Sequence, residues 1–289
     1  METPQQKIEK LKTKLNFSII IIDKPAGPTS FTISDFVRKK FKEFNISKTS
    51  HFGTLDPMVT GVLPIAIGRA CKLTGMFLGH DKKYIGTMHL HKEISIEELQ
   101  KVIDKEFTGM IMQMPPKKSA VKRQLREREI ISFKITKKED KDFFFETEVQ
   151  GGTYIRKLVH DLGEKTGLGA HMTELRRTKA GIFDNSKIYT LTQLEEAIKQ
   201  FKEGKIELLD NMLIPAEKAI KEVFPFITLD NSKKDLVRKL LTGRPIFKSD
   251  FKLPEGEVFA IFLEDKFVEI AKKVKERDNV VARPEFVYN

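Results

Sequence analysis

The chain has 289 residues, of which 40% are hydrophobic and 32% charged, a composition that excludes a disordered protein and favours a folded globular one. Its formal net charge of +11 favours a polyanionic partner, with nucleic acid ahead of an anionic membrane surface. Cys71 is the only cysteine, which excludes an internal disulfide framework and fits a reducing compartment. The longest apolar run is too short to cross a bilayer and no signal peptide is visible, so we expect a cytoplasmic protein without a membrane partner.

The first elements follow from apolar patterning. Residues 1–15 predict a polar, partly helical arm, and the β-branched run 16–22 predicts a buried strand. Proline and glycine break this strand within residues 23–30, where Thr29 or Ser30 can cap a helix. The apolar positions of that helix follow helical spacing: Phe31, Ile33, Phe36, Val37, Phe41 and Phe44.

Residues 51–64 (HFGTLDPMVTGVLP) are punctuated by glycine and proline and predict a loop around a single acid, Asp56. On residue types alone, an Asp-Pro pair most often only initiates a turn. Residues 66–78 predict a helix, and residues 83–90 predict a strand that carries Tyr84. An isolated strand tyrosine is more often a packing residue than a ligand-binding one.

His89 and His91 alternate along this strand and should face one side of it. Such a pair could bind a metal ion, but no third ligand lies nearby in the sequence. We therefore expect no metal site.

The densest basic stretch follows Pro115-Pro116. A charge run of this kind is usually a solvated face, and the alternative is a surface that contacts phosphates. Its cations are Lys117, Lys118, Lys122, Arg123, Arg126 and Arg128.

The second half of the chain predicts strands at 131–137 and 143–150 and then a helix over 155–165. From about residue 224 the pattern becomes mostly β, with one helix over 232–241 and two strands joined by a tight turn at 264–266. No internal repeat is present.

Several of these segments resemble, in the same order, the motifs of the TruB and dyskerin family of RNA pseudouridine synthases. The segments are Lys24-Pro-x-Gly-Pro-Thr-Ser, Gly-Thr-Leu-Asp56-Pro, Lys-Lys-Tyr84, Gly-Thr-Tyr-Ile-Arg156 and the companion motif at 169–183. The resemblance implies an α+β fold with a mixed, mainly antiparallel sheet and helices around it. It places the catalytic domain at 16–222, after the 1–15 arm, and a small β-rich, PUA-like RNA-binding domain at 223–289.

The resemblance also implies roles for individual side chains. Asp56 does the chemistry, Arg156 pairs with it, and Tyr84 stacks on the target base. His51, Lys24 and Leu175 are implied to bind the substrate RNA, and no cofactor or metal is implied. The alternatives are a packing tyrosine, a hydrogen-bonded loop histidine and a structural lysine.

The basic stretch resembles the Pro-Pro-x-x-Ser-Ala-Val-Lys-Arg segment of the archaeal and eukaryotic branch, and implies the archaeal-type catalytic subunit of an H/ACA guide ribonucleoprotein. The implied function is isomerisation of uridine to pseudouridine in rRNA, with tRNA as a second substrate. Guide RNA, substrate RNA and small H/ACA partner proteins are the implied partners. Two alternatives stay open: a guide-free tRNA pseudouridine synthase and a non-catalytic RNA-binding scaffold.

Overall fold

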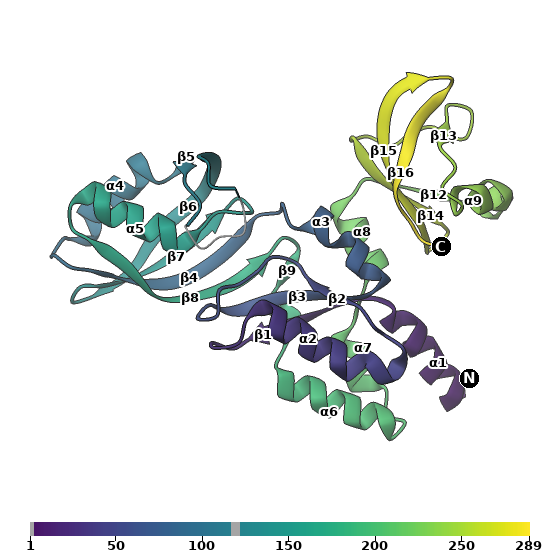
Figure 1. The fold of residues 1–289 in the computed structure, drawn as a ribbon, viewed down its shortest axis with the longest axis horizontal. Helices are drawn as coiled ribbons and strands as arrows, with labels where there is room; N and C mark the ends of the chain where they lie inside the picture. Colours follow the sequence, from purple (N-terminus) through teal and green to yellow (C-terminus); the bar gives the residue numbers. More distant parts are fainter. Residues whose placement is uncertain (1–2, 117–121) are drawn as a thin grey trace.

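The computed structural model describes residues 3–116 and 122–289, which form two sheets with helices packed around them (Figure 1). The helices are α1 (Pro4–Leu15), α2 (Ser30–Phe41), α3 (Thr74–Phe77), α4 (Ile96–Glu106), α5 (Ile155–Thr166), α6 (Leu191–Lys202), α7 (Glu207–Met212), α8 (Ala216–Val223) and α9 (Lys234–Leu240). In the described part of the chain, no helix is both long and apolar enough to span a membrane.

The larger sheet has 11 strands, and its main path runs β10-β1-β3-β8-β4-β7-β6-β5. Its strands are β1 (Phe17–Lys24), β2 (Thr49–His51), β3 (Thr60–Gly68), β4 (Lys82–Leu90), β5 (Gly109–Gln113), β6 (Arg126–Glu139), β7 (Asp142–Val149), β8 (Ala170–Ala180), β9 (Phe183–Asp184), β10 (Ile188–Tyr189) and β11 (Ile214–Pro215). Most neighbours pair antiparallel, while β1–β10 and β3–β8 pair parallel. The predicted mixed, mainly antiparallel α+β fold is confirmed.

Strand β1 explains the apolar run that begins the fold. Successive side chains of a strand point to opposite faces. Ile20 and Ile22 accordingly join the larger apolar core, whereas Ile19 and Ile21 join a second one. Because both faces of β1 are covered, every position from 17 to 22 is buried, and an alternating polar pattern is absent there.

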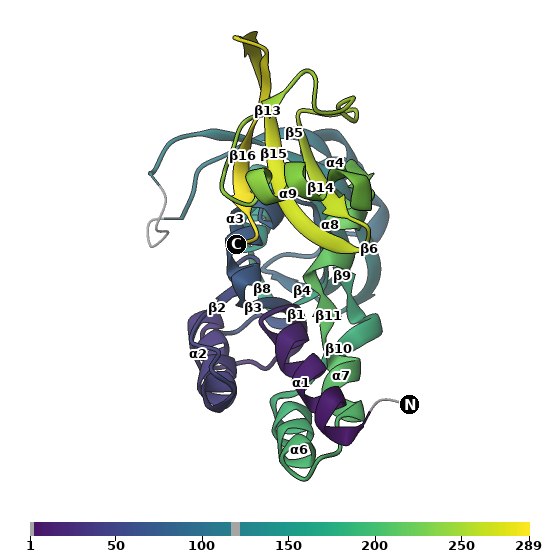
Figure 2. The ribbon, with the colours of Figure 1, turned by 90° about the vertical axis from the view of Figure 1, so that its right-hand side faces the viewer.

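The C-terminal sheet has five strands in the order β12-β14-β15-β16-β13. They are β12 (Phe226–Leu229), β13 (Ile246–Phe247), β14 (Val258–Leu263), β15 (Lys266–Arg277) and β16 (Val280–Val287), and Figure 2 shows this sheet together with α9. The predicted β-rich C-terminal region is confirmed, and the exact domain boundaries stay a prediction.

An aromatic cluster joins the C-terminal sheet to the larger one. The Phe17 ring of β1 lies 5.5 Å from the Phe267 ring and 4.6 Å from the Tyr288 ring, centroid to centroid. Phe286 belongs to the same core cluster. Removal of the C-terminal residues would therefore expose part of the core around β1 to water.

The N-terminal helix α1 packs against the larger core and is not a free arm. Thr3 caps α1 in a capping box, and Leu11 and Leu15 are buried in the larger core. Lys14 Nζ also donates to Asp210 Oδ1 of α7 at 2.5 Å. The helical prediction is confirmed, but α1 packs against the rest of the chain.

Two predictions around residues 51–78 are wrong in part. Strand β2 ends at His51 and β3 begins at Thr60, so Gly61 and Pro64 lie in a strand rather than in a loop. The segment 66–78 continues β3 to Gly68 before a 3-10 turn and the short α3. Pairing of β3 with β1 from Gly61 to Gly68 outweighs the turn preference of its glycine and proline.

Thr29, one of the two residues predicted as a cap, caps helix α2, but one apolar position of this helix does not face the core. Phe31 is 74% exposed, whereas Ile33, Val37 and Phe41 are buried. The helical spacing therefore identified the buried face of α2 from Ile33 onward.

Candidate active site

The loop between β2 and β3 carries Asp56, whose carboxylate is ion-paired. Arg156 Nη2 donates to Asp56 Oδ2 at 2.7 Å. The side chain of Asp56 is 49% exposed and that of Arg156 is 63% exposed, so water reaches both of them in the free protein. The structure thus brings together an acid and a cation that are 100 residues apart in the sequence.

The buried side chain of Lys24 holds the Asp56 loop through hydrogen bonds to backbone carbonyls. The side chain is fully buried, and its ammonium donates to the carbonyl oxygens of Pro25, Pro57 and Val59 at 2.8–2.9 Å. Burial lowers the pKa of Lys24, and the nearby Asp56 carboxylate opposes that shift. All three of its donors are thereby used, so the expectation that Lys24 binds RNA is corrected to a structural role.

Hydrogen bonds between the Gln113 side chain and the Tyr154 backbone position Arg156 at the start of α5. The Gln113 side chain donates to the Tyr154 carbonyl at 3.1 Å and accepts from the Tyr154 N–H at 2.8 Å. Gln113 is 2% exposed, so this pair of bonds is shielded from water. Gly152, at φ +90°, also leaves room for the Arg128 guanidinium, because a Cβ there would lie 3.2 Å from Arg128 Nη2.

A cross-strand row links the Asp56 loop to Tyr84. Gly61 of β3 pairs with Arg177 of β8, and Arg177 pairs with Tyr84 of β4. Arg177 is 1% exposed and donates through Nε to the Val62 carbonyl and through Nη2 to the Gly53 carbonyl. It also interacts with the Tyr84 side chain, which favours its charged form against the lowering of its pKa by burial. Arg177 therefore ties both ends of the Asp56 loop to the strand that carries Tyr84.

Arg177 was not singled out from the sequence. The available signal was its place in the companion motif at 169–183, two residues after Leu175. Lys82 was missed as well: its ammonium donates to the carbonyls of Leu78 and His80, and burial lowers its pKa to about 8. A Cβ on Gly53 would lie 3.4 Å from both Arg177 and Lys82, so both cations underlie the loop.

The remaining predicted residues of the motifs are packed against the same region. Tyr84 is 8% exposed and Leu175 is 7% exposed, and both belong to the larger core. His51 lies at the end of β2, and its Nε2 is 3.0 Å from Thr54 Oγ1. Burial lowers the pKa of His51, and Arg177 adds to that effect. The proposed RNA contacts of Tyr84, Leu175 and His51 stay predictions.

The basic stretch is only partly described. Lys117 and Lys118 lie outside the described residues, whereas Lys122 and Arg123 are exposed. Arg126 and Arg128 begin strand β6, where Arg126 Nη2 donates to the Lys122 carbonyl and Arg128 Nη1 to the Glu127 carbonyl. The four described cations therefore extend from an exposed segment to the loop that precedes Arg156.

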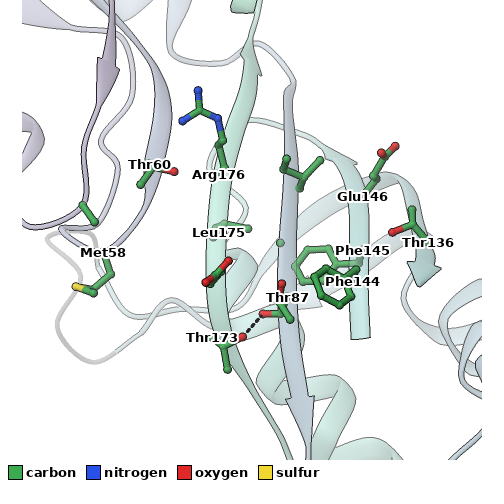
Figure 3. A pocket seen from close by; sticks show the side chains of 14 residues that line it. Met58, Thr60, Thr87, Thr136, Phe144, Phe145, Glu146, Thr173, Leu175 and Arg176 are labelled. Atoms are coloured by element: carbon green, nitrogen blue, oxygen red, sulfur yellow. Dashed lines mark hydrogen bonds between the residues drawn. The ribbon is translucent and has the colours of Figure 1, made fainter. Parts of the chain in front are cut away.

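A cavity of about 690 Å³ opens beside the Asp56 loop, over one face of the larger sheet (Figure 3). Met58 and Thr60 line one side, and Thr87 and Phe144 line the sheet floor. Arg176 also borders the cavity and is held by two hydrogen bonds to Asp23, at 2.8 and 3.0 Å. Volumes of about 300–1,000 Å³ are typical of ligand sites. Asp56 itself does not line the cavity, although its own loop does.

Comparison with known proteins identifies the family. Residues 39–155 match the model of the TruB family pseudouridylate synthase N-terminal domain, and residues 156–221 match that of the tRNA pseudouridylate synthase B C-terminal domain. A probable tRNA pseudouridine synthase B of Nanoarchaeum equitans is 43% identical over 256 residues, which cover 88% of this chain and 71% of the relative. Its counterpart in Methanocaldococcus jannaschii is 43% identical, over 79% of this chain and 66% of the relative.

Solved structures agree with the sequence matches. The structure titled as a Cbf5-Nop10-Gar1 complex contains a chain with a TM-score of 0.86 and 34% identity, over 98% of this chain and 88% of the other. A chain in an H/ACA RNP bound to a substrate RNA has a TM-score of 0.83 and 30% identity, over 99% of this chain and 89% of the other. The chain therefore belongs to the TruB family of pseudouridine synthases and is an RNA isomerase.

Proposed function

We propose that the chain isomerises uridine to pseudouridine in rRNA, and in tRNA, as the catalytic subunit of an H/ACA guide ribonucleoprotein. The ion pair between Asp56 and Arg156 carries the catalytic part of this proposal, because it holds a single carboxylate ready at an accessible loop. A scaffold that only bound RNA would have no need of a cation aimed at that carboxylate.

The reaction sets three demands that these residues can meet. The uracil must leave the RNA stack, at a cost of a few kcal/mol, before it is detached at N1 and rejoined through C5. A carboxylate that acts as nucleophile must be ionised, and an adjacent guanidinium favours the charged form. Entry of the base would displace water from the exposed Asp56–Arg156 pair and strengthen their attraction.

Tyr84 has a narrower role in this proposal than the motif alone implied. Stacking of a base on an aromatic ring contributes about 1–3 kcal/mol. Only 8% of Tyr84 is exposed, so the base would contact the small part of the ring that reaches the surface. Arg177 contacts both the Tyr84 side chain and the Gly53 carbonyl, and it would therefore fix the position of Tyr84 relative to the Asp56 loop.

The structural neighbours support guidance by RNA and small protein partners. Three neighbours, at 34%, 30% and 30% identity, come from structures whose titles name Cbf5 with Nop10 and Gar1, an H/ACA RNP with substrate RNA, and Nop10 with Cbf5. They cover 96–99% of this chain, including the C-terminal sheet. In this proposal, residues 16–222 form the catalytic domain, and residues 223–289 form a PUA-like domain that binds RNA.

Pseudouridine mapping tests the proposal. The purified chain is incubated with an rRNA substrate in four conditions: alone, with guide RNA, with Nop10- and Gar1-type partner proteins, and with both. We expect site-specific modification only when guide RNA is present. Modification of the same rRNA uridine by the chain alone would contradict guided action but not catalysis.

Guide-free action on tRNA is the second candidate, and the names of the curated relatives favour it. Both relatives described above are called probable tRNA pseudouridine synthase B. A tRNA transcript without guide RNA separates the two candidates. Modification of that transcript by the chain alone would support the second candidate.

A further inference from the structure

Three histidines meet at one end of the larger sheet, away from the Asp56 loop. His89 of β4 pairs directly with His171 of β8 and with Asp142 of β7. Residues that face each other across neighbouring strands project from the same face of the sheet. His91 lies two residues beyond His89 and contacts the same group. The third histidine that the sequence did not offer near His89 and His91 is therefore supplied by β8.

The spacing of these rings is close to that of imidazoles around one metal ion. His91 Nε2 and His171 Nδ1 are 3.2 Å apart. With metal–nitrogen bonds of about 2.0–2.1 Å, two tetrahedral nitrogen ligands lie about 3.3 Å apart and their ring centres about 5.2 Å apart. The observed centroid separations are 5.3 Å for His89–His171, 5.4 Å for His91–His171 and 6.1 Å for His89–His91.

Asp142 prepares His89 for such a role. His89 Nδ1 lies 2.7 Å from Asp142 Oδ1. A carboxylate accepts this hydrogen bond, so in the neutral His89 ring the proton would be on Nδ1 and the lone pair of Nε2 would be left for a metal. Carboxylates placed in this way orient histidine ligands in many metal sites.

Gly169 allows the close approach of His91 to the start of β8. The His91 N–H donates to the Gly169 carbonyl at 3.0 Å. A Cβ on Gly169 would lie only 2.6 Å from His91 Nδ1, and its φ of +67° also favours glycine. A larger residue would push the His91 ring away from His171.

We propose that His89, His91 and His171 bind one first-row transition-metal dication of the class that prefers imidazole, such as Zn²⁺, with Asp142 orienting His89. Among the described residues no three His, Cys, Asp or Glu side chains are placed to hold a metal ion, so the histidine rings would have to rotate to complete the site. His91 and His171 are exposed and His89 is half-buried, which leaves the rings free to rotate.

The site would join strands rather than take part in isomerisation. His89 lies five positions after Tyr84 along β4, which corresponds to about 16 Å. A bound ion would link the C-terminal end of β4 to the N-terminal end of β8. It therefore differs from the proposed RNA chemistry in both place and role.

Metal titration of the untagged chain, first freed of metal with a chelator and of nucleic acid, tests this proposal. We expect isothermal titration with Zn²⁺ to give one ion per chain, and His171→Ala to weaken binding at least about tenfold. Loss of an orienting carboxylate typically weakens metal binding by about 10–100-fold, so Asp142→Ala should fall in that range. The matched control is His160→Ala, because His160 is an exposed histidine of α5 outside the cluster.

Melting curves provide the second measurement. Without metal, all variants should have the same Tm as the wild-type chain, which would show that the fold is kept. Zn²⁺ should raise the Tm of wild type and of His160→Ala, since an ion that binds only the folded state stabilises it, but not that of His171→Ala. Equal Zn²⁺ affinity of wild type and His171→Ala, or an equal loss in His160→Ala, would overturn the proposal and leave a hydrogen-bonded histidine cluster.

Discussion

Glu269 in strand β15 should make the stability of the chain fall with rising pH. The side chain is 0% exposed, and neither of its carboxylate oxygens has a hydrogen-bond partner within the described structure. Its cross-strand neighbour in β14 is Ile261, a core residue. Burial without a compensating charge raises the pKa of Glu269 from an ordinary 4.5 to about 8.

The sign of the effect follows from proton binding. Between pH 4.5 and about 8 the folded state holds the Glu269 proton while the unfolded state has lost it. Unfolding then releases a proton, so the free energy of unfolding decreases as pH rises through this window. At about 1.4 kcal/mol per pH unit, the loss is on the order of 3 kcal/mol by pH 7 and 5 kcal/mol above pH 8.

The test is Glu269→Gln, which has nearly the same shape and stays uncharged. Urea unfolding of both chains at pH 5, 7 and 9 gives the difference in their free energies of unfolding. We expect near equality at pH 4.5–5 and a growing advantage for the variant up to about pH 8. Glu285→Gln, at an exposed position of neighbouring β16, is the matched control. Parallel pH profiles for wild type and Glu269→Gln would refute the reasoning.

Asp56→Asn should abolish pseudouridine formation while RNA affinity changes by less than about tenfold; a single-turnover rate near that of wild type would contradict the assignment. Tyr84→Leu should lose activity because an aliphatic side chain cannot stack on a base, and a normal rate would leave Tyr84 as a packing residue. Gln113→Ala removes two hydrogen bonds to the backbone ahead of α5 and should lower the single-turnover rate by up to about tenfold with RNA affinity unchanged; an unchanged rate would show that α5 holds its first turn without Gln113. Lys122→Ala combined with Arg123→Ala should weaken RNA binding at moderate salt and reduce the slope of log affinity against log salt by somewhat under one per lost contact. An unaltered slope would make these two cations ordinary surface.

Local sequence patterns identified much of the fold. The apolar run that became β1, the Thr29 cap of α2 and the mostly β character after residue 224 can all be recognised within a few neighbouring residues. Periodicity and capping are local properties, so one stretch of chain is enough to reveal them. The candidate site was different, because only the order of motifs on the chain joined Asp56 to Arg156.

Burial and long-range neighbours were decided by the tertiary structure. Lys24 could be a surface or a buried lysine in the sequence, and only the packing of the Asp56 loop around it shows the three carbonyls that bind its ammonium. By its residue type Pro64 favours a turn, but in the structure it lies in β3, which pairs with β1. His171 acquired its surroundings in the same way, from β4, which is distant in the sequence, whereas Glu269 pairs with Ile261 across the β14–β15 hairpin. Strand register sets which side chains meet and which lose water, and a local pattern does not contain that register.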